Sequence, residues 1–244
     1  MMPKFQKYVR AFAALAVCLC ATPAIAGHMT VPLTAGQAAV VQVRLDAIYG
    51  AGAVNALTDQ STASVWALPG STPGGTLPSL QFESGAFSAL VDFGIWDGAT
   101  LNKLEVFDGS AGPGAIAAVT WAADPNLATV TSVIGPGVTA GSGAINRYGF
   151  GFYISSPGSP SGFFYSDDSL NPGGEPQMLA YLGPGGRWAI FFEDLDCPTC
   201  DNYIDLVVAA ESLVPVPEPG SMILLGTGLL GLGRAARRRF GKRA

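Results

Sequence analysis

The sequence predicts an all-β exported domain, a β-sandwich or jelly roll, between an N-terminal signal peptide and a C-terminal transmembrane helix. The first observation is the composition: 32 Gly, 18 Pro and only 13% charged residues favour short strands joined by turns. The second is that apolar stretches recur at intervals of roughly 8–15 residues, with turn residues between them. The third is that the middle of the chain shows no long amphipathic helical period.

The expected strands follow one another from residue 30 to residue 210, and sequences such as DGS, GPGV, SSPGSPSG and NPGGEP form the turns between them. The segment 47–75 is the least regular, and we expect a short helix or a long loop there. Trp66, Trp96, Trp121 and Trp188 are expected in the core, with stacking on sugar rings as the alternative. The ten expected strands are 38–45, 86–96, 104–107, 115–121, 128–134, 148–154, 163–165, 178–182, 187–192 and 203–210.

The charge of the chain differs between its ends and its middle. The net charge is −5 overall, but residues 27–218 hold four basic residues against all 18 acidic ones, a net charge of −14. This balance argues against nucleic-acid binding, which depends on Lys and Arg that neutralise phosphates. It fits a soluble outward-facing protein, or one that collects cations.

The first 26 residues have the three parts of a secretory signal peptide. Basic residues at positions 4, 7 and 10 precede the apolar stretch AFAALAVCLC. The small residues Ala24 and Ala26 then form the expected site for signal peptidase. We therefore expect the exported domain to span residues 27–212.

The C-terminal segment has a different three-part order. Alternating prolines make residues 213–219 extended and exposed, because proline lacks an amide donor and blocks helix formation. Residues 220–233 form an uncharged run of 14. As a helix this run would be about 21 Å long, short of a hydrocarbon core of about 30 Å, and arginine side chains that reach the interface would extend it. We predict a transmembrane helix over 220–236 and a basic cytoplasmic tail over 237–244.

This order resembles the PEP-CTERM sorting signal. The resemblance implies that the chain is exported, held transiently in the inner membrane, and recognised at Pro-Glu-Pro by an exosortase, a membrane protease. The product would then be released, or attached at the cell surface or into extracellular polysaccharide. An ordinary C-terminal membrane anchor is the alternative. The residues that carry the resemblance are Val216, Pro217, Glu218 and Pro219, followed by Arg237, Arg238 and Arg239.

A second resemblance covers residues 93–208. Five segments carry it: FGIWD (93–97), LEVF (104–107), YGFGFY (148–153), YSDDSLNPGG (165–174) and WAIFFEDLDCPTCDNYIDLVV (188–208). They are similar to recurring elements of a domain family found in secreted and PEP-CTERM proteins. The resemblance implies a β-sandwich associated with calcium or glycans, without an enzymatic role.

Acidic side chains gather between the last two expected strands, and a hairpin would bring them together. Calcium takes six to eight hard oxygen ligands of this kind. A second oxygen-rich turn lies at residues 167–171. The sequence leaves open whether these groups bind calcium or form a solvated acidic loop. The candidate ligands are Glu193, Asp194, Asp196, Asp201, Asn202 and Asp205, with Asp167 and Asp168 from the second turn.

Cys197 and Cys200 lie in the same acidic loop. A zinc site would need two more ligands, and the one histidine of the chain, His28, is next to the mature start. In an oxidising compartment we expect a local disulfide that closes the hairpin, with a free dithiol as the alternative. The other two cysteines lie within the predicted signal peptide.

The sequence offers no catalytic set. One histidine near a terminus argues against Ser-His-Asp and Cys-His catalysis. A glycoside hydrolase would need only two carboxylates, but no pattern pairs them across a cleft. We expect that the protein is not an enzyme. The sequence indicates no cofactor other than the candidate calcium ion, and it leaves two candidate functions. The first is a structural or adhesive protein of exopolysaccharide or biofilm, and the second is a calcium-dependent carbohydrate-binding module.

Overall fold

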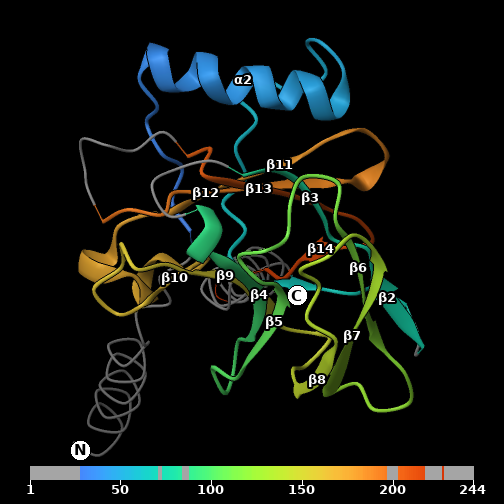
Figure 1. The fold of residues 1–244 in the computed structure, drawn as a ribbon. Coiled ribbons are helices and arrows are strands. Elements are labelled where there is room, and N and C mark those ends of the chain that lie inside the picture. The colour runs from blue at the N-terminus through green and yellow to red at the C-terminus, as the bar shows by residue number, and fades with distance from the viewer. Residues whose placement is uncertain (1–27, 71–72, 84–87, 197–202, 218–226, 228–244) are drawn as a thin grey trace, which may run out of the picture. The chain divides into compact units, whose positions relative to one another are not determined.

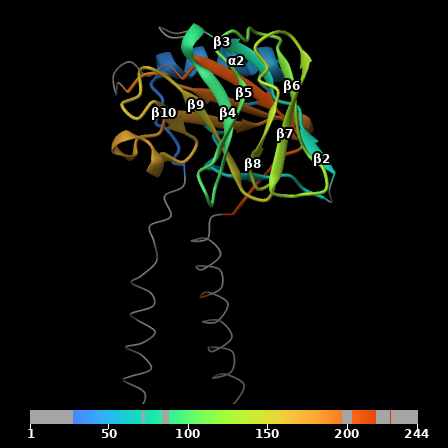
Figure 2. The ribbon, with the colours of Figure 1, turned by 60° about the horizontal axis from the view of Figure 1, so that its bottom comes forward.

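Two antiparallel β-sheets pack face to face, and the helix α2 (Ala35–Tyr49) lies on the outer face of the larger sheet (Figures 1 and 2). The computed structural model describes residues 28–70, 73–83, 88–196, 203–217 and 227. Residues 27–217 form one compact unit, to which the segments 1–26 and 218–244 do not belong. This mostly β architecture agrees with the predicted sandwich.

The smaller sheet has six strands in the order β14-β1-β9-β4-β5, with β10 also paired to β9. All of its strand pairs are antiparallel. Its strands are β1 (Trp66–Ala67), β4 (Asp92–Asp97), β5 (Lys103–Phe107), β9 (Phe150–Ser155), β10 (Phe163–Tyr165) and β14 (Val214–Pro215).

The larger sheet has eight strands in the order β11-β12-β13-β3-β6-β7-β8, with β2 paired to β6. Short 3₁₀ helices occur at Ser88–Leu90 (η1), Asp168–Leu170 (η2), Pro172–Gly174 (η3) and Pro184–Gly186 (η4). The strands are β2 (Gly74–Thr76), β3 (Ser79–Glu83), β6 (Ile116–Trp121), β7 (Leu127–Ile134), β8 (Gly141–Ala144), β11 (Met178–Leu182), β12 (Trp188–Phe192) and β13 (Leu206–Ala210).

Nine of the ten predicted strands are found, although their ends shift: the strand predicted at 86–96, for example, is observed as β4 at Asp92–Asp97. The strands that the sequence analysis did not predict are β1, β2, β3, β8 and β14, which have only two to five residues each. The strands β1 and β14 have only two residues each, and β2 and β8 are rich in glycine, which is depleted in strands.

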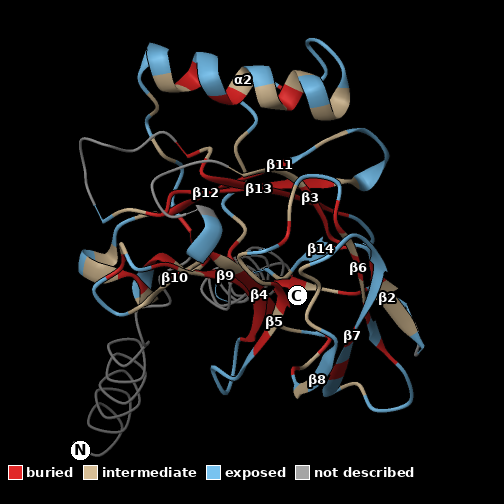
Figure 3. Cartoon of the chain, in the orientation of Figure 1, coloured by how far each residue is buried: buried red, intermediate tan, exposed pale blue. Residues whose placement is uncertain are grey.

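Strands β12 and β13 are buried on both faces (Figure 3). In β12, Trp188, Ile190 and Phe192 join the core between the two sheets, whereas Ala189 and Phe191 pack in the second cluster, beneath α2. Because neither face meets water, the strand is apolar without interruption. In β7 every second residue of the first half is exposed, so this strand alternates.

The prediction of a strand at 38–45 is wrong, because these residues belong to α2. Apolar residues at every second position indicated a strand, but a capping box starts a helix at Thr34. The Thr34 hydroxyl accepts from the Gln37 amide at 3.3 Å, and the Gln37 side chain accepts from the Thr34 amide at 2.7 Å. Ala38, Val41 and Leu45, at helical spacing, are then buried on the sheet.

The prediction that the four tryptophans lie in the core is confirmed. Trp66, Trp96, Trp121 and Trp188 are all 2% exposed or less. Three of their indole N–H groups donate to backbone carbonyls at distances between 2.7 and 3.2 Å, as buried tryptophans usually require. None of the four rings is therefore available for stacking on a sugar.

Asp97, at the end of β4, fixes the turn to β5. Its Oδ1 accepts hydrogen bonds from the Ala99 and Thr100 amides and from the Thr100 hydroxyl, and its Oδ2 accepts from the Asn146 amide at 2.7 Å. Burial by itself would raise the pKa of this carboxyl, but the hydrogen bonds outweigh burial and hold the pKa below its ordinary value. Asp97 thus joins the β4–β5 turn to the segment after β8.

Glu83 ends β3 and is partly buried beside β13, where it pairs in register with Leu206. Burial raises the pKa of its carboxyl from 4.5 to about 7. The folded state therefore holds this proton more tightly than the unfolded chain does. Stability is unaffected where both states are protonated, and it falls as the pH rises from 4.5 to about 7.

We predict that Val41→Ala destabilises the protein by about 1–2 kcal/mol, because it removes a fully buried side chain between α2 and the sheet. Val43→Ala is the matched control, since Val43 is 62% exposed on the same helix. It should change the free energy of unfolding by less than about 0.5 kcal/mol. Urea denaturation measures both, and equal effects would contradict the packing of α2 on the sheet.

Glu83→Gln should remove a pH-dependent destabilisation. We expect the variant to unfold at a higher temperature than the wild type at about pH 8, and at nearly the same temperature at about pH 4. Thermal unfolding followed by circular dichroism measures this difference. The control is Glu211→Gln, because Glu211 is exposed. If the unfolding temperatures of Glu83→Gln and wild type differ by the same amount at both pH values, ionisation of Glu83 is not the cause of the difference.

Candidate functional site

The sandwich continues up to the C-terminal proline-rich segment. Leu213 is buried in the core, and β14 pairs with β1. The Val216 amide donates to the Val65 carbonyl at 2.9 Å, and the next residue, Pro217, is exposed. The folded body therefore reaches Val216, beyond the boundary expected at 212, and Pro-Glu-Pro starts where the sheet ends.

Several predicted processing residues lie outside the residues that the structure describes. These are Ala24 and Ala26 at one end, and Glu218, Pro219 and the arginines 237–239 at the other. The predicted helix over 220–236 also lies outside them, apart from Thr227. Within the described part of the chain, no helix has the length and apolar character needed to cross a membrane.

The start of the predicted mature chain is fastened to the sandwich. The buried His28 ring approaches Asp168, with 2.9 Å between Nδ1 and Oδ1, and the Met29 amide donates to Asp168 Oδ2 at 2.7 Å. The Val31 amide donates to the Gln60 side chain at 2.9 Å. Both ends of the described body are thus held by specific hydrogen bonds.

The second oxygen-rich turn is a separate structure. Both Asp168 oxygens already bond to His28 and Met29. Asp167 caps η2, where its Oδ1 accepts from the Ser169 amide at 3.0 Å and from the Ser169 hydroxyl at 2.7 Å. Asp167 and Asp168 therefore serve local structure, and the fold does not bring them to the acidic groups between β12 and β13.

Three of the predicted metal ligands do come together, at the ends of β12 and β13. Glu193, Asp194 and Asp205 are each 3% exposed or less, and one carboxylate oxygen from each lies within 4.8 Å of the others. The pairing of Phe192 with Leu206 places Glu193 and Asp205 at neighbouring strand ends.

The backbone around the three carboxylates is tightly organised. The Asp194 amide donates to Asp205 Oδ2, and the Tyr203 amide donates to Glu193 Oε2, both at 3.3 Å. Tyr203 has a positive φ of 55°, unusual for a residue with a side chain. The Asp194 carbonyl accepts from the Ser156 hydroxyl at 2.7 Å, which ties this corner to the other sheet.

The chemistry of this group is that of hard oxygen ligands. Three buried carboxylates so close together cannot all carry full charge without compensation, so the arrangement favours either a shared proton or a bound cation. The donor set fits calcium and not zinc, which prefers nitrogen and sulfur. Asp196 is exposed and does not belong to the group. Asp201, Asn202, Cys197 and Cys200 lie outside the described residues, so the disulfide stays a prediction.

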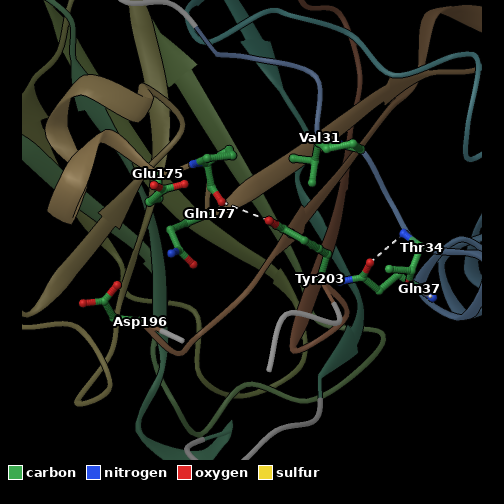
Figure 4. Close-up of a pocket in the computed structure, with 9 residues that line it drawn as sticks. Val31, Thr34, Gln37, Glu175, Gln177, Asp196 and Tyr203 are labelled. Atoms are coloured by element: carbon green, nitrogen blue, oxygen red, sulfur yellow. Dashed lines mark hydrogen bonds between the residues drawn. The ribbon is translucent and has the colours of Figure 1, made fainter. Parts of the chain in front are cut away.

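A pocket of about 300 Å³ lies next to the acidic group (Figure 4). One wall is the segment that leads into α2, the second is the segment that leads into β11, and the third comes from the β12–β13 connection. Tyr203 links this pocket to the acidic group, because its amide bonds to Glu193 while its ring lines the pocket. The lining residues are Val31, Pro32, Thr34, Gln37, Glu175, Pro176, Gln177, Asp196 and Tyr203.

Neither Gln177 nor Tyr203 stands out in the sequence as a site residue. Gln177 is 4% exposed and precedes β11, and its carbonyl accepts from the Glu193 amide at 3.1 Å. Nothing in a lone glutamine after a proline marks it as buried. Only the pairing of β11 with β12 brings Gln177 beside Glu193.

Residues 215–239 match the PEP-CTERM protein-sorting motif. No significant match was found among curated proteins or among solved structures. The motif implies an exported chain that an exosortase processes, with transient anchoring in the membrane before release at the cell surface. The motif covers the C-terminal segment only and carries no information on the function of the sandwich. The predicted sorting signal is confirmed: the chain carries a PEP-CTERM sorting motif whose first residue, Pro215, belongs to the last strand of the sandwich.

Proposed function

We propose that the β-sandwich is the mature, surface-delivered body of this protein and that it has a structural or adhesive role in extracellular polysaccharide or biofilm. The observation that carries the proposal is the junction between the sandwich and the sorting motif. The hydrogen bond from Val216 to Val65 is the last described contact of the sheet, and the motif starts at residue 215. Processing at Pro-Glu-Pro would therefore release the whole folded body.

The charge of the body supports a role outside the cell. Residues 27–218 have a net charge of −14, which keeps the domain soluble and repels acidic polymers unless cations bridge the two. Divalent cations are strong bridges between carboxylates. An acidic sandwich in an acidic polysaccharide would thus depend on such ions for cohesion.

We predict that Pro217→Ala combined with Pro219→Ala reduces processing by at least about tenfold, because alanine lets the segment leave the extended form that a protease binds. Intact-mass spectrometry of the protein recovered from cells and medium measures this. The wild type should lack residues 1–26 and everything beyond Pro-Glu-Pro, whereas the double variant should retain the arginine tail.

Pro215→Ala is the matched control, since Pro215 belongs to β14 and not to the Pro-Glu-Pro sequence. It should mature like the wild type. Retention of the arginine tail on the wild-type protein at the cell surface would overturn the sorting hypothesis. Normal maturation of the double variant would show that the two prolines are not what the protease recognises.

A calcium-dependent carbohydrate-binding module is the second candidate, favoured by the group of Glu193, Asp194 and Asp205. These residues would hold the ion, with carboxylates that already face one another at the strand ends. A bound calcium ion would compensate their charge and stiffen the corner that the Ser156 hydroxyl joins to the other sheet. Because the four tryptophans are buried, a glycan would have to contact other side chains, such as the exposed Tyr148.

We predict that calcium raises the unfolding temperature of the full-length protein by about 5–10 °C at a hundredfold excess over its Kd. Asp194→Asn with Asp205→Asn should abolish the shift, while Asp167→Asn should leave it intact. Differential scanning calorimetry with and without chelator measures this, followed by glycan-array screening in both conditions. A wild-type protein that shows no shift and no heat of calcium binding would exclude this candidate.

We propose no enzymatic activity. A glycoside hydrolase would need two carboxylates that face a substrate from opposite sides, about 5–10 Å apart. Within the described part of the chain, the group of Glu193, Asp194 and Asp205 does not offer this arrangement, because its carboxylates are buried and mutually close.

A further inference from the structure

The pocket between β11 and the segment that leads into α2 is lined by a buried side-chain oxygen that has no hydrogen-bond partner among the described residues. Gln177 is 4% exposed, and its side-chain oxygen Oε1 is buried and accepts no hydrogen bond within the described part of the chain. Figure 4 shows the Gln177 side chain lining the same pocket as Glu175 and Asp196. A buried amide oxygen without a donor is costly, so such a group indicates that a donor is supplied from outside.

The walls around Gln177 are held in place. The Gln177 carbonyl accepts from the Glu193 amide, and the Pro176 carbonyl accepts from the Tyr203 hydroxyl, both at 3.1 Å. The Thr34–Gln37 capping box fixes the opposite side. The pocket therefore exists before a ligand arrives, and its volume of about 300 Å³ suits a small molecule.

The polar groups of the pocket favour a positively charged donor. Two exposed carboxylates, Glu175 and Asp196, line it together with Gln177 Oε1, and none of the described lining residues is basic. The start of α2 would attract an anion with roughly half a positive charge. Two carboxylates outweigh that charge, and the capping box already uses the Gln37 amide. Val31 and Pro32 add an apolar surface for an alkyl or ring carbon.

We propose that this pocket binds a small organic ammonium ion. The ammonium group donates to Gln177 Oε1 and is held between the Glu175 and Asp196 carboxylates, while the carbon skeleton rests on Val31 and Pro32. The same chemistry is offered by an amino sugar and by an aliphatic diamine. The proposal does not depend on sorting or on calcium, because it uses other side chains than Glu193, Asp194 and Asp205.

Isothermal titration of the full-length protein in detergent tests the proposal, with glucosamine and 1,4-diaminobutane as probes. We expect saturable binding of at least one amine with a Kd of order 1 mM. Glucose and N-acetylglucosamine, which lack the charge, should bind at least about tenfold more weakly. Preference for glucosamine would identify an amino sugar as the source, and preference for the diamine would identify an aliphatic amine.

Two variants locate the site. Glu175→Gln with Asp196→Asn should weaken amine binding at least about tenfold, and Gln177→Met should weaken it while keeping the side-chain volume. The matched control Glu211→Gln removes an exposed carboxylate outside the pocket and should change nothing. Equal binding of glucose, an equal loss in the control, or no saturable amine binding by a wild-type protein with a cooperative unfolding transition would each overturn the proposal.

Discussion

The burial of β12 and β13 on both faces is the constraint on which the rest of the structure depends. The smaller sheet covers one face of β12 and β13, and α2 covers the other. With no face open to water, these strands must be apolar along their whole length, and their polar residues are confined to the ends. The acidic group at residues 193, 194 and 205 and the pocket beside it lie at such strand ends. Both candidate sites therefore lie at strand ends because the faces of β12 and β13 are covered.

Two hydrogen bonds mark where the chain enters and leaves the folded body. His28 is bonded to Asp168, and Val216 is bonded to Val65. The segments that export and sorting would remove lie beyond these two contacts, so the body keeps its core and its hydrogen bonds after processing. The sorting motif starts within the last strand, at residue 215. Strand β14 is therefore both the last strand of the fold and the place where the sorting motif begins.

The two candidate sites share one structural element, the connection that contains Tyr203. Its amide bonds to Glu193 in the acidic group, and its hydroxyl bonds to Pro176 in the wall of the pocket. Negative charge is concentrated on both sides of this residue, within a body that is acidic as a whole. Cations, whether metal or organic, are the ligands that such a field attracts.

The sequence by itself determined the features that depend on neighbouring residues: the C-terminal sorting motif, nine strands with a clear apolar pattern, and the burial of the four tryptophans. The sequence could not decide whether residues 38–45 form a strand or a helix. Val41, Val43 and Leu45 alternate as in a strand. Ala38, Val41 and Leu45 have the spacing of one face of a helix. The sheet surface that needed covering, together with the Thr34 cap, decided for the helix. Of the six predicted metal ligands that the structure describes, tertiary structure brings three together, since strand pairing joins residues 193 and 205 and leaves Asp168 bonded to His28. Contacts between distant strands, which no local pattern records, made that selection.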